Sequence, residues 1–127
     1  MSPRLDLHVD REQYAPGETV TGNVTVAEGG RSRKVEVSLR YREQTDDEEY
    51  EHTAVTLPGG ELHSGDLVEG SSYPFAIALP EEALPSYASA HGELYWELEA
   101  RSDELGVDTR ECRRVVVAVR PPDGPGR

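Results

Sequence analysis

The stretch Tyr14-Ala-Pro-Gly-Glu-Thr-Val-Thr-Gly-Asn-Val-Thr-Val26 decides the fold. It couples a turn to an alternating strand, because Pro16 presets φ for the turn and Gly17 supplies the positive φ that follows. Polar and apolar residues then alternate with the period of a half-buried β-strand. Gly22 takes an inward position in that strand, which predicts a bulge or a close backbone approach.

A second stretch of the same kind is Leu84-Pro-Ser-Tyr-Ala-Ser-Ala-His-Gly-Glu-Leu-Tyr-Trp-Glu-Leu-Glu-Ala100. Its alternation places Trp96 inward and Tyr95 outward. Further strands are indicated at residues 5–9, 35–42, 50–57, 73–79 and 109–119. No segment has helical periodicity, so the sequence predicts an all-β, immunoglobulin-like antiparallel β-sandwich of seven to nine strands.

Two details of this sandwich are specific enough to check. Pro58-Gly-Gly60 predicts a turn, with Glu61–Gly65 after it as a short edge strand. The inward parity of Trp96, together with the positions of Tyr14 and Phe75, predicts that these three aromatic side chains lie in the core.

The length of 127 residues predicts one domain. We expect the sandwich to span residues 1–120 and the Pro- and Gly-rich residues 121–127 to form a flexible tail. The N-terminus has no signal-peptide pattern, and no apolar run approaches the ~18 residues that span a bilayer. Cys112 is the single cysteine, so no internal disulfide is possible and a cytoplasmic location is expected.

The formal net charge is −12, from 25 acidic and 13 basic residues. This charge repels nucleic acid and anionic membranes, so we expect neither nucleic-acid binding nor membrane insertion. A neutral or basic protein or peptide is the expected partner. The simplest alternative is that the acidity only keeps the protein soluble.

The order of these motifs resembles the N-terminal domain of arrestin-like proteins, which include bacterial sporulation-control proteins. The resemblance covers about residues 5–119. It is carried by the following residues: Tyr14, Pro16, Gly17, Val20, Gly22, Val24, Phe75, Ile77, Leu79, Pro80, Pro85, Ser86, Tyr87, Gly92, Leu94, Leu98, Ala100 and Asp103. Most of these form turns, bends and strand ends, so the match bears on fold more than on function.

The resemblance implies a non-enzymatic adaptor or scaffold without catalytic residues. A peptide or protein would bind through a strand edge or the end loops, and the first strand and Glu61–Gly65 are the candidate edges. A homodimer formed by strand-edge pairing is a competing use of these edges. Two alternatives remain open: an extracytoplasmic macroglobulin-type structural module and a self-assembling structural protein.

Candidate partner-binding residues follow from the outward face around Tyr95. An exposed aromatic ring between Glu93 and Glu97 is suited to bind an Arg or Lys side chain of a partner. Packing of Tyr95 against a neighbouring strand is the alternative. Asp46 and Asp47, in an acidic loop, are a second candidate contact for a basic partner.

The sequence patterns of catalysis and metal binding are lacking. His8, His52, His63 and His91 lie far apart, and no pair has zinc-site spacing. No Gly-x-Ser-x-Gly elbow occurs. We expect Cys112 to be a buried or half-buried structural residue, although its Arg neighbours make a reactive thiol the alternative. The sequence therefore predicts no enzyme, no metal and no cofactor.

Overall fold

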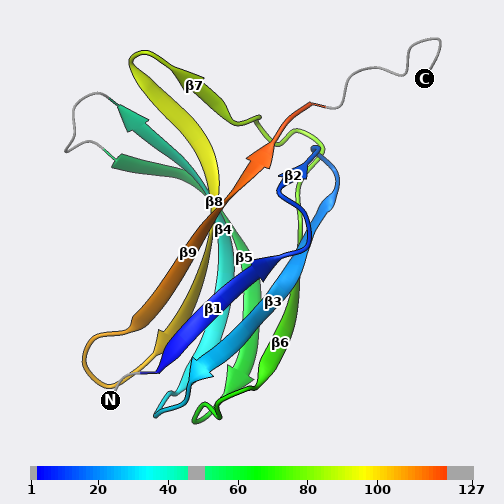
Figure 1. Ribbon diagram of the computed structural model, residues 1–127. Coiled ribbons are helices and arrows are strands. Elements are labelled where there is room, and N and C mark those ends of the chain that lie inside the picture. Colours follow the sequence, from blue (N-terminus) through cyan, green and yellow to red (C-terminus); the bar gives the residue numbers. More distant parts are fainter. Residues whose placement is uncertain (1–2, 46–50, 120–127) are drawn as a thin grey trace.

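The computed structural model describes residues 3–45 and 51–119 (Figure 1). These residues form nine strands and no helix, within the expected number of strands. The strands are β1 (Arg4–Val9), β2 (Gln13–Tyr14), β3 (Thr19–Glu28), β4 (Lys34–Thr45), β5 (Glu51–Ser64), β6 (Ser72–Ala78), β7 (Tyr87–Ser89), β8 (Gly92–Asp103) and β9 (Thr109–Val117). The expected tail, 121–127, lies outside the described residues. In the described part of the chain no helix is suited to cross a membrane.

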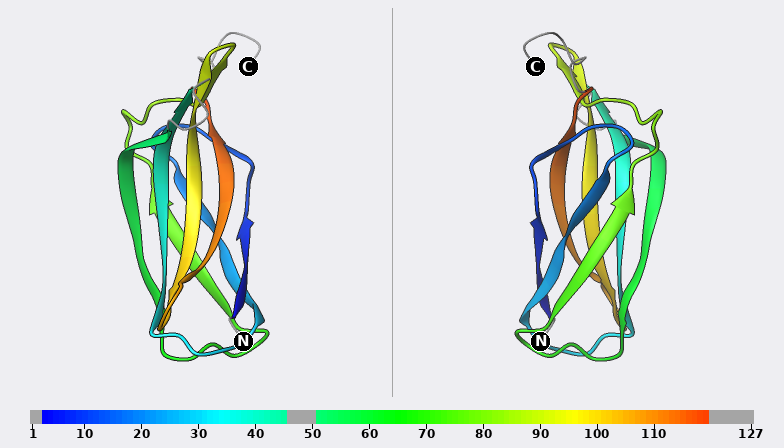
Figure 2. Two further views of the ribbon diagram at one scale, coloured as in Figure 1. Left: turned by 90° about the vertical axis from the view of Figure 1, so that its left-hand side faces the viewer. Right: turned by 90° about the vertical axis from the view of Figure 1, so that its right-hand side faces the viewer.

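The strands form two sheets that pack face to face. The small sheet has the order β1-β3-β6, and the large sheet has the order β2-β9-β8-β4-β5, with β7 added beside β8. The two residues of β2 pair with β9 in parallel, and the other pairings are antiparallel. Figure 2 shows the small sheet lying across one face of the large one. The expected antiparallel β-sandwich is confirmed.

The core lies between the sheets and is built by strict alternation. Every second side chain is buried from Val20 to Val26 on β3 and from Val35 to Tyr41 on β4, as the period-two pattern predicts. Trp96 is 2% exposed and packs on Tyr41 with ring centroids 4.9 Å apart. Tyr14 and Phe75 are also buried, so the predicted aromatic core is confirmed.

Gly22 of β3 lies between β1 and β6. It pairs with Val9 on one side and with Phe75 on the other. A Cβ at this position would lie 2.0 Å from the His8 carbonyl oxygen and 2.7 Å from Phe75 Cζ. The predicted close approach is confirmed, and it requires a residue without a side chain.

The prediction of a turn at Pro58-Gly-Gly60 is wrong, because β5 runs straight through it. Val37 pairs with Gly60 and Ser38 with Pro58, so Gly59 is the extra residue of a β-bulge. A bulge in an edge strand uses the same residue types as a turn, because Pro58 needs no ladder hydrogen bond at an edge. Glu61–Ser64 is therefore the end of a long edge strand, and Gly65 follows it.

Both expected edge strands, β1 and the end of β5, lie at the edge of a sheet, and each has a feature that hinders pairing with a further strand. Register shifts interrupt the pairing of β5 at three points along its length. Side chains of β9 engage the backbone of β1 and of the residue before it. Arg113 Nη1 donates to the Leu7 carbonyl at 3.4 Å, and Thr109 Oγ1 donates to the Pro3 carbonyl at 3.3 Å. Bulges and covering side chains of this kind discourage the addition of a further strand.

The segment 80–86 closes one end of the sandwich. Trp96 Nε1 donates to the Leu84 carbonyl at 2.7 Å, and the Tyr41 hydroxyl donates to the Pro85 carbonyl at 3.1 Å. Ser86 N donates to the Val117 carbonyl at 2.7 Å. These bonds tie the closing segment to the core at the level of Tyr41 and Trp96.

Candidate binding surface at the protruding end of the large sheet

The large sheet continues past the level at which the segment 80–86 closes the sandwich. This extension, which we call the protruding end, consists of Arg42–Thr45, Tyr87–Ser89 and Gly92–Tyr95, and Figure 1 shows it reaching beyond the small sheet. Leu94 pairs with Glu43 on one side and with Tyr87 on the other. Directly paired residues point to the same face, so these three side chains continue the face that elsewhere forms the core.

A break in the sheet opens a hollow at this end. β7 pairs with β8 at residues 92–94, and β9 pairs with β8 at residues 96–102, so Tyr95 lies between the two pairings. A hollow of about 290 Å³ forms there, which we call the notch. It is lined by Ser86, Tyr87, Ala88, Glu93, Leu94, Tyr95, Arg114, Val115 and Val116.

The expectation of an exposed Tyr95 is wrong, although its outward direction is as predicted. The residue is only 7% exposed. The guanidinium carbon of Arg114 lies 3.7 Å from the ring centroid, and Arg114 Nη1 contacts Glu93 Oε1 at 2.9 Å. The cation–π contact expected for a partner is therefore made within the chain. Only the register of β9 against β8 brings Arg114 over Tyr95, and that register is not visible in the sequence.

Glu97, the third outward residue expected at this site, is engaged elsewhere. Its Oε1 lies 2.6 Å from Arg40 Nη2 and 3.4 Å from Arg42 Nη1, and its side chain is 14% exposed. Glu97 thus belongs to a row of ion pairs across β4 and β8, where both carboxylate and guanidinium groups are partly withdrawn from water. The other two candidates, Asp46 and Asp47, lie outside the described residues.

A second hollow, of about 180 Å³, lies on the opposite face of the protruding end. It is lined by Glu43, Gln44, Thr45, Tyr87, Ser89, His91, Gly92, Glu93 and Leu94. Glu43 supplies a carboxylate on this face, whereas the carboxylate of Glu93 is paired with Arg114 on the outer face. Among the residues described, the lining contains neither Lys nor Arg, so we call it the acidic hollow. Tyr87, Glu93 and Leu94 line both it and the notch, which makes the two hollows neighbours.

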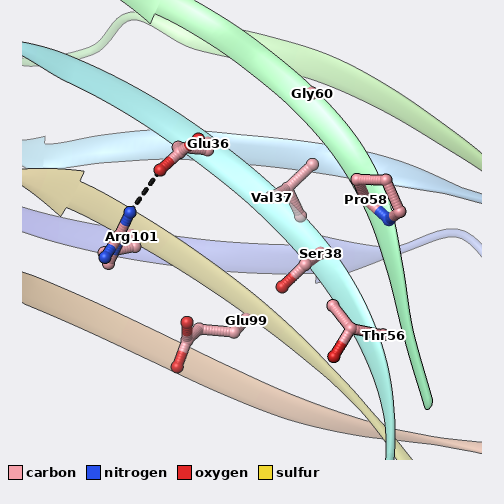
Figure 3. Close-up of a pocket in the computed structure, with 8 residues that line it drawn as sticks. All are labelled: Glu36, Val37, Ser38, Thr56, Pro58, Gly60, Glu99 and Arg101. Atoms are coloured by element: carbon pink, nitrogen blue, oxygen red, sulfur yellow. Dashed lines mark hydrogen bonds and ion pairs between the residues drawn. The ribbon is translucent and has the colours of Figure 1, made fainter.

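A further hollow of about 180 Å³ lies on the outer face of the large sheet (Figure 3). Arg101 from β8 points to Glu36 of β4 across it, and the two form an ion pair. The hydrogen bond from Arg101 is the main cause that lowers the pKa of Glu36, and the same bond raises the pKa of Arg101. Both groups stay charged and mutually neutralised near neutral pH, which suits a structural ion pair more than proton transfer.

The expectation of a buried or half-buried Cys112 is wrong, because this residue is exposed on β9. Partial loss of water around the sulfur raises the pKa of its thiol, and the carboxylates of Glu97 and Glu99 raise it further. A raised pKa lowers the fraction of thiolate, which is the nucleophilic form. The alternative of a reactive thiol therefore finds no support here.

The described histidines do not converge. His8 is exposed on β1 and His91 is exposed in the turn between β7 and β8, while His63 stacks on Tyr73 with ring centroids 4.8 Å apart. In the described part of the chain, no three His, Cys, Asp or Glu side chains are grouped to hold a metal ion.

The fold has a counterpart among solved structures. The chain is similar to Spo0M, a sporulation control protein from Bacillus subtilis, with a TM-score of 0.69 and 20% sequence identity over 94% of this chain. The chain covers 51% of that protein's length. The arrestin-like fold expected from the sequence is confirmed, and at this identity the likeness concerns the fold alone.

Other comparisons add little. A superoxide reductase (neelaredoxin) from Ignicoccus hospitalis aligns with a TM-score of 0.41 and 10% identity, covering 93% of this chain and 81% of that one. A similarity this low carries no argument. No protein-family model matches the chain, and no curated protein sequence matches it.

Proposed function

We propose that this chain is a non-enzymatic protein-binding module that docks a segment of a partner protein at the protruding end of its large sheet. The observation that carries the proposal is the notch, where Tyr87 is 61% and Val116 48% exposed beside an apolar floor. Apolar side chains gathered at a hollow of the surface are typical of an interaction site.

The size of the notch favours a side chain of a partner as its occupant. Small-molecule sites have volumes of about 300–1,000 Å³, and the notch lies just below this range. At about 290 Å³ it suits one large anchor residue better than a cofactor. Binding through one or two buried anchors surrounded by polar contacts is common at protein interfaces.

The condition of the long strand edges also favours the protruding end. Bulges interrupt β5, and Arg113 covers part of β1, so strand addition is disfavoured at both. The three residues of β7 are all exposed and, among the described strands, pair with β8 alone. A partner therefore meets a short strand edge and an end hollow at the same place, as binding through an edge or end loops requires.

The charged groups of the outer face support the non-enzymatic part of the proposal. Catalytic acids and bases need a free proton-transfer position and a suitable pKa. Here Glu36 is held by Arg101, Glu97 by Arg40, and the Cys112 thiol has a raised pKa. We place the module in the cytoplasm, because an exposed free thiol such as Cys112 persists in a reducing compartment.

Site-specific crosslinking tests this proposal. The photoreactive residue p-benzoylphenylalanine replaces Tyr87 in one variant and Asp6, exposed on β1 of the other sheet, in a control. Both variants are expressed in the source cells and irradiated. We expect a protein adduct that forms from position 87 and not from position 6. Equal adducts from both positions, or none from position 87, would contradict the proposal.

A further inference from the structure

We propose that the partner segment presents a large apolar residue next to a Lys or Arg residue. The apolar side chain enters the notch, and the basic side chain enters the acidic hollow on the opposite face of the protruding end. This inference rests on the proposed function and names the chemistry of the partner.

The notch is built for an apolar group. Tyr95, Leu94 and Val115 line it from β8 and β9, while Tyr87 and Val116 stand exposed at its sides. Its charged residues, Arg114 and Glu93, are paired with each other at 2.9 Å. A charged side chain entering here would compete with an existing ion pair, whereas an apolar side chain buries the exposed flanks of Tyr87 and Val116 without breaking that pair.

The acidic hollow is built for a cation. Glu43 contributes the charged group of this face, together with the exposed ring of Tyr87. Glu93 also lines the hollow, but its carboxylate is paired with Arg114 on the outer face. Glu43 forms no ion pair with any described Lys or Arg. Burial is the main cause that raises the pKa of Tyr41, and the negative charge of Glu43 is the second. Glu43 therefore interacts electrostatically with a residue at the closed end of the sandwich.

The chain itself contains a precedent for the contact that we propose. On the outer face, the Arg114 guanidinium lies over Tyr95 and pairs with Glu93. On the opposite face, Glu43 and Tyr87 lie on the two sides of Leu94, so a carboxylate and an aromatic ring again share one face. The lining of the second face holds no Lys or Arg in the part of the chain that is described. A guanidinium or ammonium group from a partner supplies the missing cation.

One extended segment is able to use both hollows. Tyr87, Glu93 and Leu94 line both, so the two sites lie on either side of the same short strand. Successive residues of an extended segment point to opposite sides, which suits an apolar and a basic residue close together in sequence. The net charge of −12 also attracts a basic segment at long range.

Selection from a peptide library tests this inference. The probe is a library of random linear peptides displayed on phage and selected on the full chain. We expect the enriched peptides to carry a large apolar residue beside Lys or Arg. The enriched peptides, made synthetically, should bind the Tyr87→Ser and Val116→Ser variants of the chain about tenfold more weakly than the unaltered chain. Each substitution removes an exposed apolar contact at the notch.

The basic contact has its own readout. Glu43→Gln should weaken the same peptides by about fivefold, in the range of a cation–π and ion-pair contact at an exposed site. Peptides whose Lys or Arg is replaced by norleucine should bind the Glu43→Gln variant and the unaltered chain equally. Asp6→Asn and Val68→Ser, both exposed away from the protruding end, are matched controls and should leave affinity unchanged.

The outcomes separate this inference from the proposed function. The inference is overturned if the enriched peptides are acidic, or if their affinity is unchanged by Tyr87→Ser and Glu43→Gln. Either result leaves the proposed protein-binding function standing. A selection that enriches no peptide also overturns the inference, and crosslinking from position 87 then decides on the proposed function independently.

Discussion

Trp96 donates the hydrogen of its indole Nε1 to the carbonyl oxygen of Leu84 over 2.7 Å, which ties the centre of the core to the segment that closes the sandwich. The Tyr41 hydroxyl makes the equivalent bond to Pro85. The two rings lie against each other in the core, so packing and hydrogen bonding act on the same pair. The protruding end begins directly beyond this pair, and its position therefore depends on it.

Substitutions at this pair should separate packing from hydrogen bonding. Trp96→Ala should lower the free energy of unfolding by about 3–5 kcal/mol, because it leaves a large cavity in the core. Tyr41→Phe removes only the hydroxyl and should cost about 1 kcal/mol. Urea unfolding of each variant gives the values. A Trp96→Ala variant as stable as the unaltered chain would show that this ring is not a core residue.

The stacking of Arg114 on Tyr95 should be measurable as a coupling energy. In a double-mutant cycle with Arg114→Ala and Tyr95→Leu, we expect a coupling of about 0.5–1 kcal/mol, as found for cation–π contacts at exposed sites. A second cycle, with Arg114→Ala and Glu93→Gln, measures the coupling within the ion pair. This coupling should fall at high salt, because the side chains of Arg114 and Glu93 are half and one-third exposed. Arg110, exposed on the same strand, supplies the control Arg110→Ala. Zero coupling between Arg114 and Tyr95 would mean that the contact contributes no stability.

The Cys112 thiol should react slowly for an exposed cysteine. Its pKa is raised by desolvation and by the carboxylates of Glu97 and Glu99, so less thiolate is present at neutral pH than in a free cysteine. The pH profile of alkylation by iodoacetamide measures this pKa. Glu99→Gln should shift the profile to lower pH, and Glu69→Gln, remote in sequence and exposed, serves as the control. A midpoint below that of free cysteine would refute the predicted direction.

The sequence predicted the elements of the fold whose cause is local. Gly22 is an example, because the alternation around it placed it inward. A Cβ at this position would lie 2.0 Å from the His8 carbonyl oxygen, so only glycine fits. Pro58 is the opposite case, since a turn and an edge-strand bulge use the same residues and only the pairing of β4 with β5 separates them. The exposure of Tyr95 could not be predicted, because Arg114 covers it from a neighbouring strand. The position of a residue in the alternation of its strand predicts to which face its side chain points. Whether a neighbouring side chain covers it depends on the register between strands.

The ion pair between Glu36 and Arg101 should make part of the stability depend on pH. The hydrogen bond from Arg101 lowers the pKa of Glu36 in the folded chain below the value of 4.5 for an unperturbed carboxyl. A carboxyl with a lowered folded-state pKa stabilises the fold fully above its unfolded pKa, and this contribution is lost as the pH falls through the folded pKa. The stability difference between the unaltered chain and Glu36→Gln should therefore be present at neutral pH and should shrink below pH 4.5. Urea unfolding across this range measures the difference. Arg101→Leu should reduce its pH dependence and leave the smaller part that comes from Lys34. The side chains are about one-third exposed, so added salt should reduce the difference at neutral pH as well. A difference that grows on acidification would contradict the lowered pKa of Glu36.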